Sequence, residues 1–166
     1  IALHQGLVSD ADIMKVLEAA RAVPIENDQI LLHALPQEYK VDHQVGVVNP
    51  LGMSGSRLEA MVHLIAVNRN SVMNTQHCVS RSELETNRLI LDQIASAEAV
   101  LTSDEKQLGC CLINIGAGTT SLILYHGGAI RHTACLPLGG DNITNDLSMA
   151  LRTTVAVANK VKITHG

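Results

Sequence analysis

The feature that most constrains how this chain folds is a glycine-rich turn between two apolar runs near its middle. Cys110–Ile115 precedes the turn, Leu122–Tyr125 follows it, and both runs have the composition of β-strands. The intervening Gly116-Ala117-Gly118-Thr119-Thr120 is short and can turn backbone amides toward an anion. The pattern predicts either a phosphate-binding hairpin or an ordinary β-hairpin with a polar turn, and the turn alone leaves both open.

The composition indicates an aliphatic core and argues against a nucleic-acid partner. Of the 166 residues, 46% are hydrophobic, yet there are only two tyrosines and no Phe or Trp. This argues against base stacking on aromatic side chains as a binding mode. A net charge of −4 gives no basic field for duplex DNA. We expect a soluble, cytosolic α/β protein of one domain or two small ones.

Cysteines and histidines give no metal or disulfide pattern. The four cysteines lack a CxxC spacing, and the eight histidines form no HxH or HExxH motif. We expect reduced thiols and no metal ligands. No apolar run reaches the ~20 residues of a transmembrane helix. Because the chain begins with Ile1 and ends directly after a helical pattern, we expect it to be a piece of a longer protein.

Hydrophobic periodicity in the first half predicts the order strand, helix, strand, strand. The helix begins at Ser9, where Asp12 completes a capping-box pattern. The expected elements are a strand at 1–4, this helix, one or two strands over 29–36 and 38–44, a loop at 45–55, a strand at 57–67 and a helix at 70–82.

The second half predicts a run of three strands followed by helices, after a boundary near 84–87. The expected elements are a short strand at 88–91, a helix at 95–101, a polar turn at 103–106, strands at 108–115, 121–125 and 129–136, and helices after 139 and over 155–161. Gly139-Gly140-Asp141 opens the first of these two helices. Its glycines suit either close approach to a phosphate or simple capping.

Several segments together resemble the FtsA family of bacterial cell-division proteins. The resemblance rests on the PQEY element within Leu35–Tyr39, the GMSG element within Asn49–Gly55, and the segments Ala95–Thr102, Gly127–Thr133 and Gly139–Asp146. These segments are collinear and span nearly the whole chain. On the residues alone, PQEY predicts a strand with its tyrosine over the core. The GMSG loop suits a protein contact or a passive turn equally.

The resemblance implies an actin-like (ribonuclease H-like) fold with an SHS2-type subdomain called 1C. Residues 1–84 would form subdomain 1C, 85–104 would return to subdomain 1A, and 105–166 would open subdomain 2A with the second phosphate hairpin. The first phosphate loop, subdomain 2B and the membrane-binding C-terminal helix would lie outside this chain. We therefore expect the chain alone to bind ATP poorly.

The resemblance also implies an assembly protein that is at most a weak ATPase, with ATP and Mg²⁺ as its cofactor. Its partners would be further copies in a filament, FtsZ and later division proteins of the FtsN kind, on the inner face of the cell membrane at the division site. No residue is implied to be catalytic or to bind metal directly. The implied nucleotide-binding residues are Asn114, Gly116, Ala117, Gly118, Thr119, Thr120, Gly139 and Gly140.

The loop departs from the family's usual DIGGGTTD at Asn114, Ala117 and Ser121. An amide at position 114 removes a charge that would hold hydrated Mg²⁺, so hydrolysis should suffer more than binding. Ala117 fits the turn only if its φ is negative. Two alternatives stay open: an actin-like pilus-assembly protein, and a true ATPase or kinase of the superfamily, against which Asn114 argues.

Overall fold

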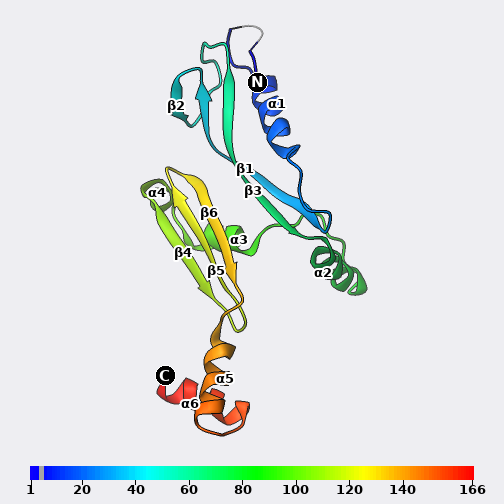
Figure 1. The fold of residues 1–166 in the computed structure, drawn as a ribbon, viewed down its shortest axis with the longest axis vertical. Coiled ribbons are helices and arrows are strands. Elements are labelled where there is room, and N and C mark those ends of the chain that lie inside the picture. Colours follow the sequence, from blue (N-terminus) through cyan, green and yellow to red (C-terminus); the bar gives the residue numbers. More distant parts are fainter. Residues whose placement is uncertain (4–5) are drawn as a thin grey trace.

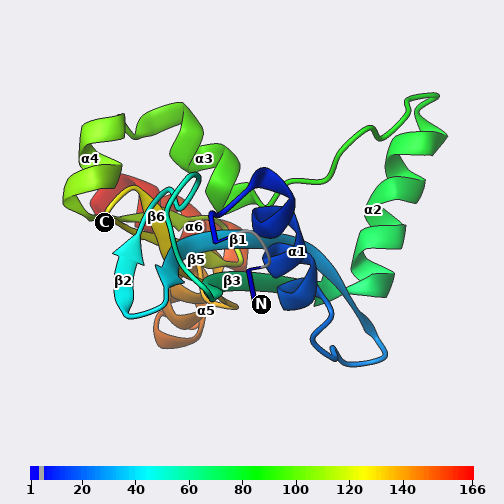
Figure 2. The same ribbon diagram turned by 90° about the horizontal axis from the view of Figure 1, so that it is seen from above.

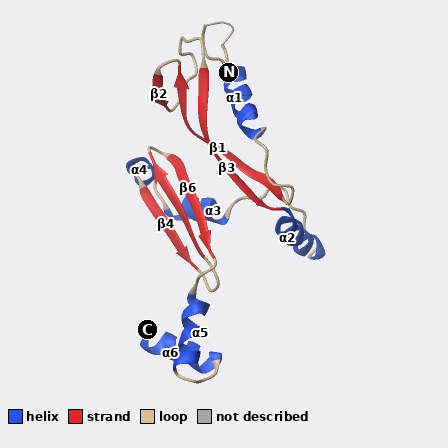
Figure 3. Cartoon of the chain, viewed as in Figure 1, coloured by secondary structure: helices blue, strands red, loops and turns tan. Residues whose placement is uncertain are grey.

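The computed structural model of the chain describes residues 1–3 and 6–166, which form two antiparallel three-stranded sheets in tandem (Figure 1). Helices accompany both sheets, and a helical pair follows the second, so the fold is mixed α/β (Figure 3). The elements are α1 (Asp10–Arg21), β1 (Gln29–Val41), β2 (Gln44–Val47), β3 (Leu58–Asn68), α2 (Arg69–Arg81), α3 (Asp92–Val100), α4 (Ser103–Leu108), β4 (Cys110–Ile115), β5 (Thr120–His126), β6 (Ala129–Leu136), α5 (Gly140–Ala150) and α6 (Val155–His165).

The N-terminal sheet has the strand order β2-β1-β3, and α1 packs against β1 and β3 (Figure 2). The helix begins where Ser9 and Asp12 bond each other's backbone amides, so the capping-box prediction is confirmed. Between helix and sheet lies an aliphatic core with one tyrosine. Its buried members are Val8, Val16, Tyr39, Val41 and Leu58.

The expected strand at 1–4 is reduced to isolated bridges. Ala2 pairs with Arg57 and Leu7 with Ser54, while His4 lies outside the described residues. The GMSG loop also forms a hydrogen bond to this N-terminal segment, because Gly52 N–H donates to Val8 O at 2.9 Å. A side chain at Gly55 would place its Cβ 2.5 Å from Val41 Cγ1. Close packing against Val41 therefore requires a glycine at the second glycine position of GMSG.

The C-terminal sheet has the order β4-β5-β6, which confirms the three consecutive strands predicted from the glycine turn. Helix α3 covers one face, where Ala97, Ile123 and Tyr125 form a second buried cluster. On the other face, none of the described elements gives comparable cover: Ile113 is 56% exposed and Ile115 is 72% exposed.

Three local predictions were incomplete or wrong, and one that was left open is now resolved. Residues 29–41 form one strand, and β2 occupies part of the expected loop because Asp42, at φ 50°, closes a tight turn. Residues 88–91 are not a strand, since the amide of Leu91 donates to His33 Nε2 at 3.1 Å instead of to a neighbouring strand. The polar turn at 103–106 is the start of α4, capped by Thr102 and Glu105.

The two sheets meet where the middle of β1 contacts β6. A bulge between Pro36 and Glu38 leaves Gln37 without a β3 partner, because proline cannot donate to the ladder. Gln37 Nε2 instead donates to the carbonyl oxygens of Ile130 (2.7 Å) and Arg131 (3.1 Å), and Arg131 Nη1 lies 3.3 Å from Glu38 Oε2. We call Gln37, Glu38 and Arg131 the clasp, and it gives the PQEY element a role that periodicity did not predict.

A histidine completes this contact. His63 Nε2 on β3 lies 3.0 Å from Thr133 Oγ1 on β6. Burial, and secondarily the neighbouring His132, lowers the pKa of His63 below its usual value. The neutral imidazole is therefore the form favoured at the contact.

Candidate phosphate-binding site

The glycine-rich turn joins β4 to β5 as an exposed four-residue loop, residues 116–119. Gly116 N–H donates to Thr119 O at 2.8 Å and closes it. Within the described part of the chain, the amides of Ala117, Gly118 and Thr119 have no acceptor. Ala117 is not among the residues with positive φ, so the condition set for an alanine at this position is met. Three unpartnered, exposed N–H groups on one short loop can hold an anion.

The start of α5 supports the loop from behind. Gly140 N–H donates to Gly116 O at 2.9 Å, and Asp141 N–H donates to Ala117 O at 2.7 Å. A Cβ on Gly139 would lie 2.4 Å from Ala117 O, so only glycine allows this approach. The structure thus places both Gly139 and Gly140 against the loop. Both of their amides already bond protein oxygens, that of Gly139 to Asn142 Oδ1 at 2.8 Å and that of Gly140 to Gly116 O.

A lysine from α6 reaches the same place. Lys162 Nζ donates to Gly140 O at 2.8 Å and to Thr144 Oγ1 at 2.6 Å. An ammonium group beside a loop with open amides suits a phosphate ligand. The sequence analysis missed Lys162, since neither spacing nor composition links it to a turn more than forty residues earlier.

The side chains around the loop divide into those that bond protein and those that face solvent. Thr120 Oγ1 donates to Leu138 O at 2.7 Å, so this hydroxyl ties the loop to the segment before α5. Asn114 lies directly opposite Ser121 in the β4–β5 pair and is exposed. Ser121 is 4% exposed, and its hydroxyl lies 3.3 Å from Asp92 Oδ2 on α3. Asp92 is a second residue that the sequence analysis missed.

These groups fit a phosphate group better than a directly bound metal ion. Within residues 1–3 and 6–166, no three His, Cys, Asp or Glu side chains are grouped to hold a metal. The four cysteines are unpaired. Open amides and the Lys162 ammonium suit phosphate oxygens. Two carboxylates lie nearby, that of Asp141, whose amide bonds Ala117 O, and that of Asp92 beside Ser121.

Among the described residues, no helix has the length and apolar content that a bilayer span requires.

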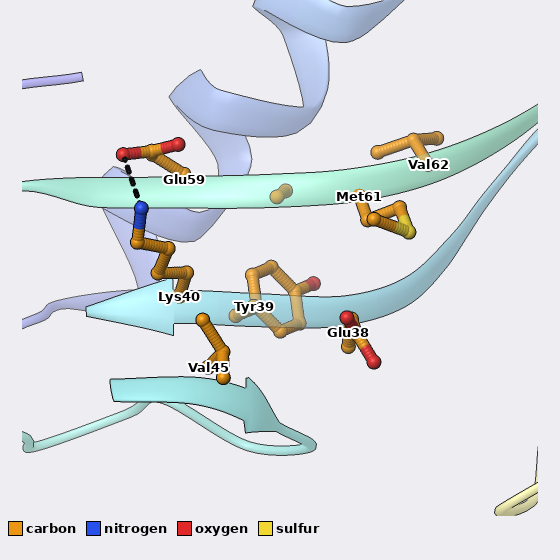
Figure 4. Close-up of a pocket in the computed structure, with 8 residues that line it drawn as sticks. Glu38, Tyr39, Lys40, Val45, Glu59, Met61 and Val62 are labelled. Carbon is orange, nitrogen blue, oxygen red and sulfur yellow. Dashed lines mark ion pairs between the residues drawn. The ribbon is translucent and has the colours of Figure 1, made fainter. Parts of the chain in front are cut away.

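A second concavity lies on the N-terminal sheet, on the side away from α1, with a volume of about 420 Å³ (Figure 4). Met61 and Val45 supply exposed apolar surface, and the ion pair between Lys40 and Glu59 lies at its edge with Nζ and Oε1 3.5 Å apart. Its lining is Glu38, Tyr39, Lys40, Val45, Glu59, Ala60, Met61 and Val62. We call it the groove.

Two sequence-family models match this chain. The SHS2 domain inserted in FtsA matches residues 1–66, and the cell division protein FtsA matches residues 111–166. The FtsA proteins of Pseudomonas aeruginosa and Neisseria meningitidis are 52% and 46% identical over 98% and 100% of this chain. The FtsA of Escherichia coli K12 is 39% identical over the whole of this chain. The chain spans 39% to 40% of the length of these relatives.

A solved structure titled "PilM-PilN type IV pilus biogenesis complex" superposes with a TM-score of 0.66 over 94% of this chain and 44% of its own, at 19% identity. At that identity the likeness concerns the fold alone. The architecture, with its glycine hairpin backed by a helix, is that of the actin-like fold. Within that class the chain belongs to the FtsA family of cell-division proteins, as the family models and the identities over 98% to 100% of this chain show.

Proposed function

We propose that this chain supplies one phosphate-binding half of the nucleotide site of an actin-like cell-division adaptor, with ATP and Mg²⁺ as its conformational ligand. The observation that carries the proposal is the loop of residues 116–119 with three open amides, held from behind by α5 and flanked by Lys162. Residues 1–84 would serve as subdomain 1C, 85–104 as part of 1A, and 105–166 as the start of 2A. Asn114, Gly116, Ala117, Gly118, Thr119 and Thr120 would form the loop's nucleotide face, with Gly139 and Gly140 behind it.

A pair of variants at one position tests phosphate binding in the intact protein. A Cβ on Gly118 would meet no atom within 4 Å, so side chains are accommodated there. Gly118→Glu places a negative charge beside the phosphate, and Gly118→Gln adds the same bulk without the charge. Calorimetric titration with ATP and Mg²⁺ should show at least about a tenfold loss for the glutamate relative to the glutamine. Equal affinities for the two variants would refute phosphate binding at this loop.

The adaptor function, rather than an enzyme with real turnover, is proposed from Asn114. A phosphotransfer site is expected to carry a carboxylate near Mg²⁺, and position 114 has an amide. Asn114→Asp should raise ATP turnover of the intact protein more than it changes ATP affinity. Wild-type turnover at ordinary enzyme rates of ~1–10³ per second would instead support the alternative of a true ATPase.

The partners are proposed in the same way: further copies in a filament, FtsZ, and later division proteins of the FtsN kind. The membrane link would come through a helix outside this chain, with the protein on the inner face of the cell membrane. The groove, apolar in its middle and charged at its edge, is a surface suited to protein contact. Met61→Glu should reduce sedimentable polymer of the intact protein relative to Met61→Gln, and equal sedimentation would exclude the groove from the filament contact.

A further inference from the structure

We propose that Gln37 is a positioning residue for the phosphate-binding loop, although its side chain lies at the far end of β6 from that loop. The inference rests on the proposed nucleotide function and deepens it, because it links ATP affinity to the contact between the two sheets. The strand β6 carries the effect. It runs from the clasp, beside the middle of β1, to the start of α5, which supports the loop (Figure 1).

The clasp joins two strand irregularities that face each other. In β1 the ladder with β3 skips Gln37. In β6 the ladder with β5 skips Arg131, since His132 and Ile130 pair with consecutive residues of β5. A bulged residue leaves the ladder and bends its strand. The two carbonyl oxygens at the β6 bulge accept hydrogen bonds from Gln37 Nε2, at 2.7 and 3.1 Å, so Gln37 holds the bend of β6.

At its other end β6 leads directly to the back of the loop. In the residues that follow the strand, Gly140 N–H donates to Gly116 O at 2.9 Å, and Asp141 N–H donates to Ala117 O at 2.7 Å. A trans peptide is planar, and its C=O and N–H groups point in opposite directions. Because both loop carbonyls point back toward α5, the amides of Ala117 and Gly118 point forward, to where a phosphate would bind.

A single strand carries the effect because the path is short and continuous. Thr133 Oγ1, in the middle of β6, lies 3.0 Å from His63 Nε2 on β3, and Gly139 follows after about 20 Å of extended chain. The path has two states, one with the bulge held by Gln37 and one with the bulge released. Release changes the bend of β6, and the start of α5 then moves relative to the loop carbonyls that it holds.

The held state is the one with the higher ATP affinity. Two amides are already aimed at the phosphate in that state, so binding does not have to order them. By reciprocity, bound phosphate favours the held state by the same factor. The path leaves out the core between the N-terminal sheet and α1, where Val41 and Gly55 pack.

Calorimetric titration of the intact protein with ATP and Mg²⁺ tests the role of Gln37. Gln37→Leu removes the donor and keeps most of the volume, and it should weaken ATP binding about three- to tenfold, the factor that corresponds to one typical hydrogen bond. Gln37→Glu, which turns an oxygen toward the two carbonyl groups, should weaken binding at least as much. Gln44→Leu, at an exposed glutamine on β2 of the same sheet, is the matched control and should leave the affinity unchanged.

A second measurement distinguishes positioning from a merely structural role. ATP and Mg²⁺ at saturation should slow hydrogen exchange in the wild-type peptide that covers residues 30–41, because phosphate at the loop stabilises the clasp. In Gln37→Leu, also at saturation, this ATP-dependent protection of residues 30–41 should be lost.

The outcomes separate this inference from the function on which it rests. A wild type that does not bind ATP would overturn the proposed function, and the role of Gln37 with it. Wild-type ATP affinity in both Gln37 variants would overturn the role of Gln37 alone. A loss of affinity in the variants, without ATP-dependent protection of residues 30–41 in the wild type, would also contradict it, since Gln37 would then support the fold without positioning the loop.

Discussion

The two sheets of this chain have the same three-stranded antiparallel construction and use it differently. In the N-terminal sheet, β1 and β3 bury Tyr39, Val41 and Leu58 against α1. In the C-terminal sheet, α3 covers one face in the same way. The opposite face of each sheet leaves apolar side chains exposed, Met61 in the first and Ile115 in the second, so the sheets differ in the loop that the second one carries. The open loop with its free amides belongs to the second sheet. The same sheet construction can therefore carry either a closed turn, as between β1 and β2, or an exposed loop with unpaired amides, as between β4 and β5.

The largest expected effect comes from the core of the N-terminal sheet. Leu58 is fully buried, so Leu58→Ala should destabilise this sheet by about 2–5 kcal/mol through lost burial and a cavity. Met61→Ala on the same strand, where the side chain is 55% exposed, is the control and should have little effect. Hydrogen exchange followed by mass spectrometry should show faster exchange in β1–β3 only. Equal acceleration in β4–β6 would mean that the sheets unfold as one unit.

The next largest effect is expected at two glycines, Gly139 and Gly55, which lie too close to neighbouring atoms to leave room for a Cβ. Gly139→Ala would push against Ala117 O and should displace the loop, while Gly55→Ala would push against Val41 Cγ1 in the N-terminal core. Each overpacking should cost about 1–3 kcal/mol. We expect only Gly139→Ala to weaken ATP binding by the intact protein. A comparable loss of ATP affinity in Gly55→Ala would show that the N-terminal sheet controls the loop.

The clasp between the sheets should contribute a smaller energy. A double-mutant cycle with Glu38→Gln and Arg131→Gln should give a coupling of about 0.5–1 kcal/mol, because the pair is partly exposed and joined to further hydrogen bonds. The pair Lys40–Glu59, within the N-terminal sheet and more exposed, is the comparison and should couple less. Chemical denaturation measures both coupling energies. A coupling energy of zero between Glu38 and Arg131 would show that this ion pair does not stabilise the contact between the sheets.

The smallest effect is a pH dependence at the same contact. Because the pKa of His63 is lowered in the folded protein, its neutral form contributes stability that is present above the usual histidine pKa of about 6.5. That stability should be lost as the pH falls below this value through the lowered pKa. Protection factors in β6, which correct for the slower intrinsic exchange at lower pH, should fall between pH 7 and 5 in the wild type and much less in His63→Gln. An equal fall in both would show that another group titrates there.

Sequence patterns predicted what depends on neighbours along the chain. The Ser9 cap, the alternation in β3 and the hairpin around Gly116–Gly118 are local signals, and each led to the observed element. The α4 helix could also have been found, because Thr102 and Glu105 form a capping box. An apolar run alone does not distinguish a strand from an extended packed segment. For this reason the strand predicted at 88–91 was wrong.

The candidate site was predictable only in part, for a physical reason. The loop residues adjoin one another in sequence, whereas Lys162 and Asp92 reach the loop region through helices that fold back onto it. The clasp likewise joins residues 93 and 94 positions apart. Such contacts follow from tertiary packing, and neither spacing nor periodicity encodes them.

The most direct test of the central claim is a crystal structure of the intact protein with ATP and Mg²⁺. The account predicts phosphate oxygens at hydrogen-bond distance, about 2.7–3.2 Å, from the amide nitrogens of Ala117, Gly118 and Thr119. A phosphate bound elsewhere, with these three amides facing solvent or protein acceptors, would contradict it.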